Sequence, residues 1–141
     1  MKITVEIEGR ETLEELKKLK RRLSNLAIPL ENYTRWFKKE TDKQFDTEKD
    51  SDGLPWEKLK PYTLARKKRL GYPKKILTES GNTRQTLYHK SSKFEGEVGI
   101  EGNAGFHQDG TERLPERKII GMNEQREKKL ETTMYKWVNP T

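Results

Sequence analysis

Residues 29–45, "PLENYTRWFKKETDKQF", decide how this chain folds. Apolar side chains recur in this stretch at the loose spacing of one face of an α-helix. Pro29 suits the first turn of a helix, where its missing N–H costs no hydrogen bond. The stretch therefore predicts a long helix whose apolar face consists of Leu30, Tyr33, Phe37 and Phe45, with Trp36 beside it.

The segment before this helix predicts a strand and then another helix. Residues 2–8 alternate apolar and polar side chains, as a half-buried strand does, and Gly9 ends the alternation. Thr12 followed by Glu15 matches a capping box, in which the two side chains satisfy free N–H groups at a helix start. The helix that follows carries a leucine face made of Leu13, Leu16, Leu19, Leu23 and Leu26.

The segment after the long helix predicts shorter elements. Pro61 opens a third helix, which closes near Gly71. Residues 94–102 suggest a short strand near a hairpin, and the glycine-rich residues 105–121 indicate a loop. A last helix begins at about Asn123 and brings together Leu130, Met134, Trp137 and Val138.

This order of elements predicts one small α+β domain over residues 1–141. It comprises an N-terminal strand, two to three helices, a short antiparallel sheet and a C-terminal helix. Residues 1–10 and 123–141 are candidate arms that lie across a neighbouring subunit. Ile, Val, Leu and Phe make up only about 20% of the chain, near the lower limit for a globular domain. We therefore expect the chain to complete its burial against partners.

Composition excludes several classes of protein. The chain has no cysteine, so neither a disulfide framework nor a thiolate metal site is available. No stretch approaches the ~20 apolar residues of a membrane span, so we expect a soluble protein made in the cytosol, with no membrane partner.

Reactive side chains do not form a recognisable catalytic pattern. His89 and His107 lack further ligands at metal-binding spacing. A calcium loop starting at Glu48 fails because Leu59 stands where a bidentate glutamate is required. No P-loop, dinucleotide fingerprint or nucleophile–histidine–acid pattern occurs. We expect a protein that is not an enzyme and holds no cofactor and no metal.

The net charge of +7 comes from one segment, residues 56–75, in which eight bases accompany Glu57 alone. Bases and acids cancel over the rest of the chain. Together with Trp56, Tyr62 and Tyr72, this mix suits phosphate contact with some stacking, or docking on an acidic protein. The candidate partner-facing or DNA-facing patch consists of Lys58, Lys60, Arg66, Lys67, Lys68, Arg69, Lys74 and Lys75.

Five short motifs occur in an order that resembles the phage virion morphogenesis family, the tail-completion and head–tail joining proteins of Mu-like and P2-like phages. They are the loop "DSDGLPW", the helix start "PYT", the turn "LTESGNT", and the sequences "HQDG" and "LPERKIIG". The resemblance spans roughly Phe45 to Met122. Thr83 replaces the leucine usual in the family's turn, and Asp109 replaces an aromatic residue.

The resemblance implies a structural role for the residues in these motifs. His107 and Gln108 would tie loops together in a turn, and Arg117 would form an ion pair ahead of the last helix. The implied structural residues are Trp56, Thr63, Gly81, His107, Gln108, Gly110, Pro115 and Arg117.

The resemblance further implies a virion structural protein of the neck, assembled in the host cytoplasm. It would form a ring of about six or twelve copies, complete the tail and join it to the head, as tail terminator or head–tail connector. Its partners would be itself, the neighbouring neck, connector and tail-tube proteins, and packaged DNA contacted non-specifically. Trp36, Trp56 and Trp137 would be exposed in a free subunit.

Two alternatives stay open at this stage. The basic patch would either dock on the adjoining ring or face DNA in the channel. A different class of function is a non-enzymatic nucleic-acid-binding protein that uses the basic segment 58–75.

Overall fold

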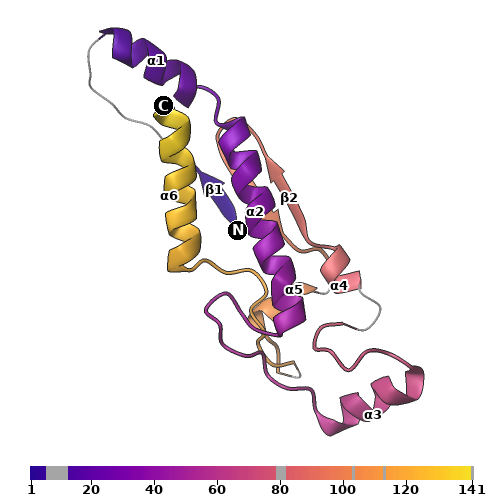
Figure 1. The fold of residues 1–141 in the computed structure, drawn as a ribbon. Helices are drawn as coiled ribbons and strands as arrows, with labels where there is room; N and C mark the ends of the chain where they lie inside the picture. The colour runs from indigo at the N-terminus through magenta and orange to yellow at the C-terminus, as the bar shows by residue number, and fades with distance from the viewer. Residues whose placement is uncertain (6–12, 79–81, 103, 113, 141) are drawn as a thin grey trace.

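A computed structural model describes residues 1–5, 13–78, 82–102, 104–112 and 114–140 (Figure 1). It confirms a small α+β architecture of helices and a short antiparallel sheet. In chain order the elements are β1 (Lys2–Thr4), α1 (Leu13–Leu23), α2 (Ala27–Thr47), α3 (Pro61–Leu70), α4 (Asn82–Gln85), β2 (Tyr88–Ser91), β3 (Glu95–Gly99), α5 (Ala104–Asp109) and α6 (Glu124–Val138).

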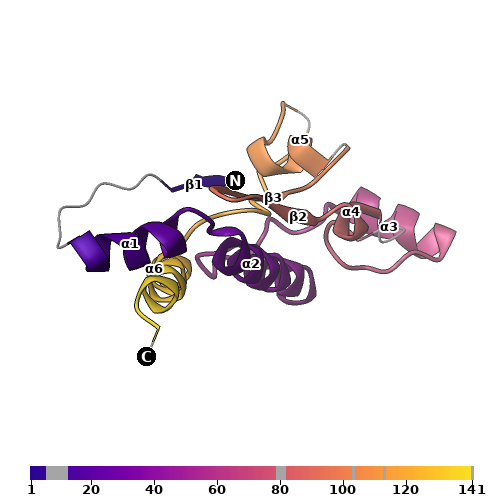
Figure 2. The same ribbon diagram turned by 90° about the horizontal axis from the view of Figure 1, so that it is seen from above.

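The sheet has the order β1-β3-β2, and both strand pairs are antiparallel. Figure 2 shows α2 and α6 on one side of the sheet and α5 on the other. The strands alternate as antiparallel strands with one covered face do: Val98 faces α2 and is buried, whereas Glu97 on the opposite face is only partly buried and pairs with Lys90.

Helix α2 contributes four of the ten buried hydrophobic residues in the described part of the chain. The predicted apolar face is confirmed, since each of its four residues is at most 1% exposed: Leu30, Tyr33, Phe37 and Phe45. The helix begins two residues before Pro29, which therefore lies inside the first turn, where a missing N–H is tolerated. It ends at Glu48, which takes a left-handed conformation with φ 57°.

Two hydrophobic clusters share this helix. Near its C-terminal end, Phe45 packs edge-to-face on Trp56, with ring centroids 5.5 Å apart. The rest of that cluster is Ile76, Leu87 and Ile119. Toward the other end, Tyr33 and Phe37 pack against Val98 of β3. Trp56 is thus a core residue that is 4% exposed, and the prediction of an exposed Trp56 was wrong.

Both ends of the chain have partners within the same molecule. Strand β1 pairs with β3, and the N-terminal ammonium donates to the Val98 carbonyl at 2.7 Å. Helix α6 packs on α2 and begins at Glu124, close to the predicted start. Asn123 caps it by accepting from the Arg126 N–H at 2.8 Å. The expected arms at residues 1–10 and 123–141 concern contacts between chains and stay a prediction.

Arg126 joins α6 to α2 through a buried network. Its side chain is 4% exposed, and its guanidinium donates to Gln44 Oε1 and to the Gly121 carbonyl, both at 2.6 Å. The Gln44 amide in turn donates to the Ile119 carbonyl at 2.8 Å. The Tyr33 hydroxyl donates to the Arg126 carbonyl at 2.7 Å, and burial raises the pKa of Tyr33 to about 12.

This guanidinium also lies 4.6 Å from the centroid of the Phe37 ring, where the π-face attracts a cation. Burial lowers the pKa of Arg126, but an arginine stays protonated at neutral pH. The buried charge is therefore stabilised by neutral acceptors and an aromatic ring. Among the described residues, no carboxylate forms an ion pair with it.

Replacing Arg126 by methionine keeps the volume but leaves Gln44 Oε1 and the Gly121 carbonyl without their donor. Each orphaned buried acceptor costs about 1–3 kcal/mol, so we expect Arg126→Met to lower the free energy of unfolding by about 3 kcal/mol. Urea denaturation measures this change. Lys128→Met, on the exposed side of the same helix, should stay within about 0.5 kcal/mol of wild type. Equal effects of the two substitutions would contradict the network's role.

Candidate functional site

Helix α3 lies at the end of the molecule opposite α1 (Figure 1). It begins as predicted at Pro61, and Gly71 ends it in a left-handed conformation with φ 74°. Large apolar side chains remain in solvent along it, with Tyr62 80% and Leu70 52% exposed. A helix that exposes such residues is suited to contact with another molecule.

Most of the predicted basic patch is exposed around this helix. We call it the α3 surface, and it consists of Lys58, Lys60, Lys68, Arg69 and Lys74 with Tyr62, Leu70 and Tyr72. Lys75 is also exposed, but its ammonium donates to the Asp46 carbonyl at 2.7 Å. Arg66 is partly buried, and its interactions within the chain make it less accessible to a partner.

Lys67 departs from the prediction of a partner-facing or DNA-facing cation. It is 4% exposed, and its ammonium donates to the carbonyls of Lys75 at 2.6 Å and Thr78 at 2.8 Å. These bonds hold the segment after α3 against the helix. Lys67 turns inward because carbonyl groups there replace its lost hydration.

A cavity of about 320 Å³ lies beside α3 and brings together residues from three distant stretches of the chain. Predicted residues on its wall are Lys58, Lys60, Thr63, Lys67, His107, Pro115 and Arg117. Leu59, Leu77 and Leu114 add an apolar part. The charged side chains of the wall are therefore mostly cationic, with Glu57 as an acid among the lining residues.

Hydrogen bonds to backbone carbonyls hold His107 and Arg117 in the wall of this cavity. The Arg117 N–H donates to the His107 carbonyl at 2.6 Å, and Arg117 Nε donates to the Glu57 carbonyl at 2.9 Å. Arg117 was expected to form an ion pair, and its guanidinium instead donates to the backbone carbonyl of Glu57. Burial, and then the charge of Arg117, lower the pKa of His107, so His107 is neutral near pH 7. Its Nδ1 is buried without a hydrogen-bond partner among the described residues.

Gln108 joins two segments through both ends of its amide. Its Oε1 accepts from the N–H groups of Ile119 at 2.7 Å and Ile120 at 2.8 Å, and its Nε2 donates to the Ile120 carbonyl at 2.8 Å. His107 and Gln108 lie in the short helix α5, where the sequence had indicated only a loop. Gly110 ends α5 with φ 75°, and a Cβ there would meet the Glu116 nitrogen at 2.9 Å.

Trp56 occupies the cluster described above and donates from Nε1 to the Lys118 carbonyl at 2.9 Å. Trp56, Gln108 and Arg117 thus all contact backbone of other segments, which makes these motif residues architectural. Gly81 lies outside the described residues.

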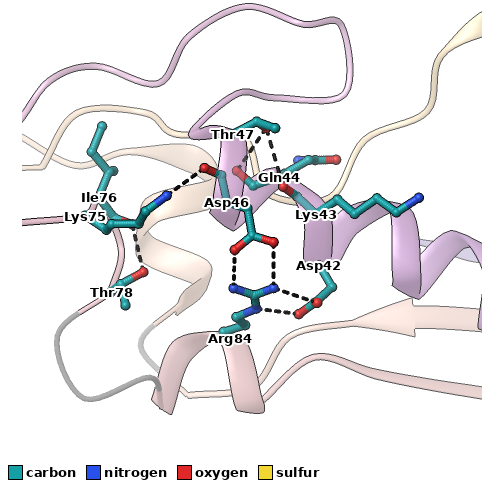
Figure 3. A network of polar contacts seen from close by, with 9 residues as sticks. All are labelled: Asp42, Lys43, Gln44, Asp46, Thr47, Lys75, Ile76, Thr78 and Arg84. Atoms are coloured by element: carbon teal, nitrogen blue, oxygen red, sulfur yellow. Dashed lines mark hydrogen bonds and ion pairs between the residues drawn. The ribbon is translucent and has the colours of Figure 1, made fainter. Parts of the chain in front are cut away.

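Sequence reasoning missed an arginine that clamps two segments together. Figure 3 shows the Arg84 guanidinium between Asp42 and Asp46, which lie one turn apart on α2. It donates to both oxygens of each carboxylate, at 2.7 and 2.8 Å for Asp42 and at 2.8 and 3.1 Å for Asp46. The hydrogen bonds from Arg84 lower the pKa of Asp46. The clamp fastens α4 to α2, and Lys75 holds the segment after α3 on the same helix through the Asp46 carbonyl.

A second cationic surface, on α1, was also missed. Lys17, Lys18, Lys20 and Arg21 are exposed there, and among the described residues no carboxylate pairs with them. The cations of residues 17–22 do not show in the net charge outside residues 56–75, because acids elsewhere in the chain cancel them. A local count over residues 17–22 would have found them.

The described part of the chain holds no group of three or more metal-ligating side chains. None of its helices combines the length and apolar character that a membrane span requires. What these surfaces offer chemically is attraction for an anionic partner, through exposed cations with apolar side chains beside them.

We expect Arg84→Gln to lower the melting temperature at pH 7, because it removes the clamp. The carboxylate pKa of Asp46 is lowered by folding, so its contribution is present above the ordinary value near 3.8 and is lost as pH falls through the folded value. Thermal denaturation across pH should therefore show a constant gap between wild type and variant above about pH 5, which narrows below about pH 4.

The control is Lys43→Gln, an exposed change on α2 next to Asp42 that leaves the clamp intact. It should leave the melting temperature nearly unchanged at every pH. A gap for Arg84→Gln that persists undiminished to pH 2 would mean that the clamp does not act through ionised Asp46.

The sequence model of the phage virion morphogenesis family matches residues 7–139, which extends well beyond the segment that carried the motif resemblance. No curated protein and no solved structure gives a significant match to this chain.

Proposed function

This chain belongs to the phage virion morphogenesis family, and from that premise we propose that it is a structural protein of the neck, which forms a ring, completes the tail and joins it to the head. Membership over nearly the whole chain is the observation that carries the proposal. It points to a structural, non-enzymatic role in building the virion, in agreement with the architectural use of the motif residues.

The α3 surface supports the joining step. Its cations stand in solvent at one end of the molecule, beside Tyr62 and Leu70, which are more than half exposed. A charged rim around apolar contacts is typical of a protein interface, whereas a phosphate backbone offers cations no apolar counterpart. We therefore assign this surface to docking on an acidic face of the adjoining ring.

Electron microscopy of a lysate from a phage with this gene interrupted tests the role. Filled heads beside separate tails of normal length are the expected result for a joining protein. Tails of irregular length would instead indicate a terminator that stops tube growth. Ordinary infectious particles would refute the proposal and favour a nucleic-acid-binding protein.

Charge reversal on the α3 surface tests docking against channel DNA. With Lys68→Glu and Arg69→Glu, two exposed positions, we expect intact rings that fail to join heads to tails. Negative-stain microscopy of particles and of the purified protein measures both properties. Joined particles that lose DNA would instead place this surface in the channel. The matched control is Lys39→Glu with Lys93→Glu, two exposed changes outside the α3 surface and outside the predicted arms, which should leave joining intact.

A further inference from the structure

Helix α1 is attached to the rest of the molecule at one end. Trp137 Nε1 donates to the Arg22 carbonyl at 2.8 Å, and the Arg22 guanidinium lies 4.7 Å from the Trp137 ring centroid. Further along the helix, Leu16 and Leu19 are only partly buried. The leucine face is thus incompletely covered by the described residues of its own chain.

The charge of α1 indicates which kind of surface would cover the exposed part of the helix. Four cations are exposed close together on this helix, and none forms an ion pair with a described residue: Lys17, Lys18, Lys20 and Arg21. Like charges so close repel one another, and an acidic neighbour relieves that repulsion. The complement of α1 is therefore an acidic surface with an apolar contact in it.

Such a surface exists on the chain itself, around α5. Glu101, Asp109 and Glu112 are exposed there, and no ion pair from the described residues engages them. Phe106, on α5 itself, is 57% exposed, and the three carboxylates lie within about six residues of it along the chain. The α5 surface, defined by these four residues, thus offers what α1 lacks: negative charge and an apolar side chain.

The two surfaces lie on different sides of one molecule. In Figure 2, α1 lies on the α2 and α6 side of the sheet, whereas α5 stands on the opposite side. In Figure 1 the two helices are again well apart along the molecule. Surfaces placed in this way can meet between copies, in a heterologous contact that repeats from one subunit to the next.

We propose that α1 of one copy docks on the α5 surface of the next copy, with its cations facing Glu101, Asp109 and Glu112 and its leucine face covering Phe106. This contact rests on the proposed ring and names the subunit interface within it. The α3 surface has the same sign of charge as α1, so these two ends of neighbouring copies repel, which favours side-by-side over end-to-end packing.

A charge swap in the full-length chain tests the contact. The α1 set is Lys17→Glu, Lys20→Glu and Arg21→Glu, and the α5 set is Glu101→Lys, Asp109→Lys and Glu112→Lys. Sedimentation velocity at low salt measures the association of each variant. We expect either set alone to weaken association by about tenfold or more, and the combined variant to recover most of it, because opposite charges again face each other.

The matched control combines the α5 set with an α3 set of equal charge change, Lys68→Glu, Arg69→Glu and Lys74→Glu. It should not restore association. Circular dichroism should show unchanged melting for every set, since the altered side chains are exposed and unpaired among the described residues.

Three outcomes overturn the contact. These are a wild-type chain that stays monomeric, association that survives the α1 set, and rescue by the α3 set in place of the α1 set. The second and third outcomes do not bear on the neck role, which gene interruption tests separately in the virion, whereas a monomeric wild type also counts against the ring. Infectious particles after interruption together with a successful charge swap would refute the neck role and leave the contact standing.

Discussion

The guanidinium of Arg126 is the contact on which the rest of the structure depends. It closes α6 on α2 through Gln44, holds the segment before α6 through the Gly121 carbonyl, and lies on the Phe37 ring. Because the chain has so few large apolar residues, hydrophobic burial alone stabilises the packing of α6 on α2 only weakly. A buried cation satisfied by neutral acceptors provides cohesion there, at a desolvation cost that the hydrogen bonds offset.

Polar contacts also hold α4, α5 and the segment after α3 in place, because few apolar residues are available there. Arg84 clamps α4 to two carboxylates of α2, Lys67 ties the segment after α3 to carbonyls, and Gln108 stitches α5 to residues 119–120. Each is a directional polar contact in a place where an apolar cluster would need more side chains. Lys67 ties the end of α3, and the hydrogen bond from Trp137 ties the end of α1. Both helices remain exposed along most of their length.

Prediction from the sequence succeeded where structure follows from local spacing. The apolar face of α2, the start of α3 at Pro61, its end at Gly71 and the start of α6 near Asn123 all depend on neighbours within a few residues. Trp56 and Lys67 were misjudged because a local pattern does not reveal which residues a side chain meets after the chain turns. Motif order identified the family, yet it did not show that Gln108 bonds to backbone while His107 Nδ1 has no described partner.

By itself the sequence determined the class of fold, the long central helix, the concentration of cations around residues 56–75, and the family. These properties depend on composition, periodicity and motif order, which are legible along the chain. Only the tertiary structure decided which cations face solvent, which carboxylates Arg84 clamps, and that α1 and α5 stand on opposite sides of the sheet. Such facts depend on residues tens of positions apart being brought together, and a hydrogen bond or an ion pair acts only over the few ångströms that folding alone arranges.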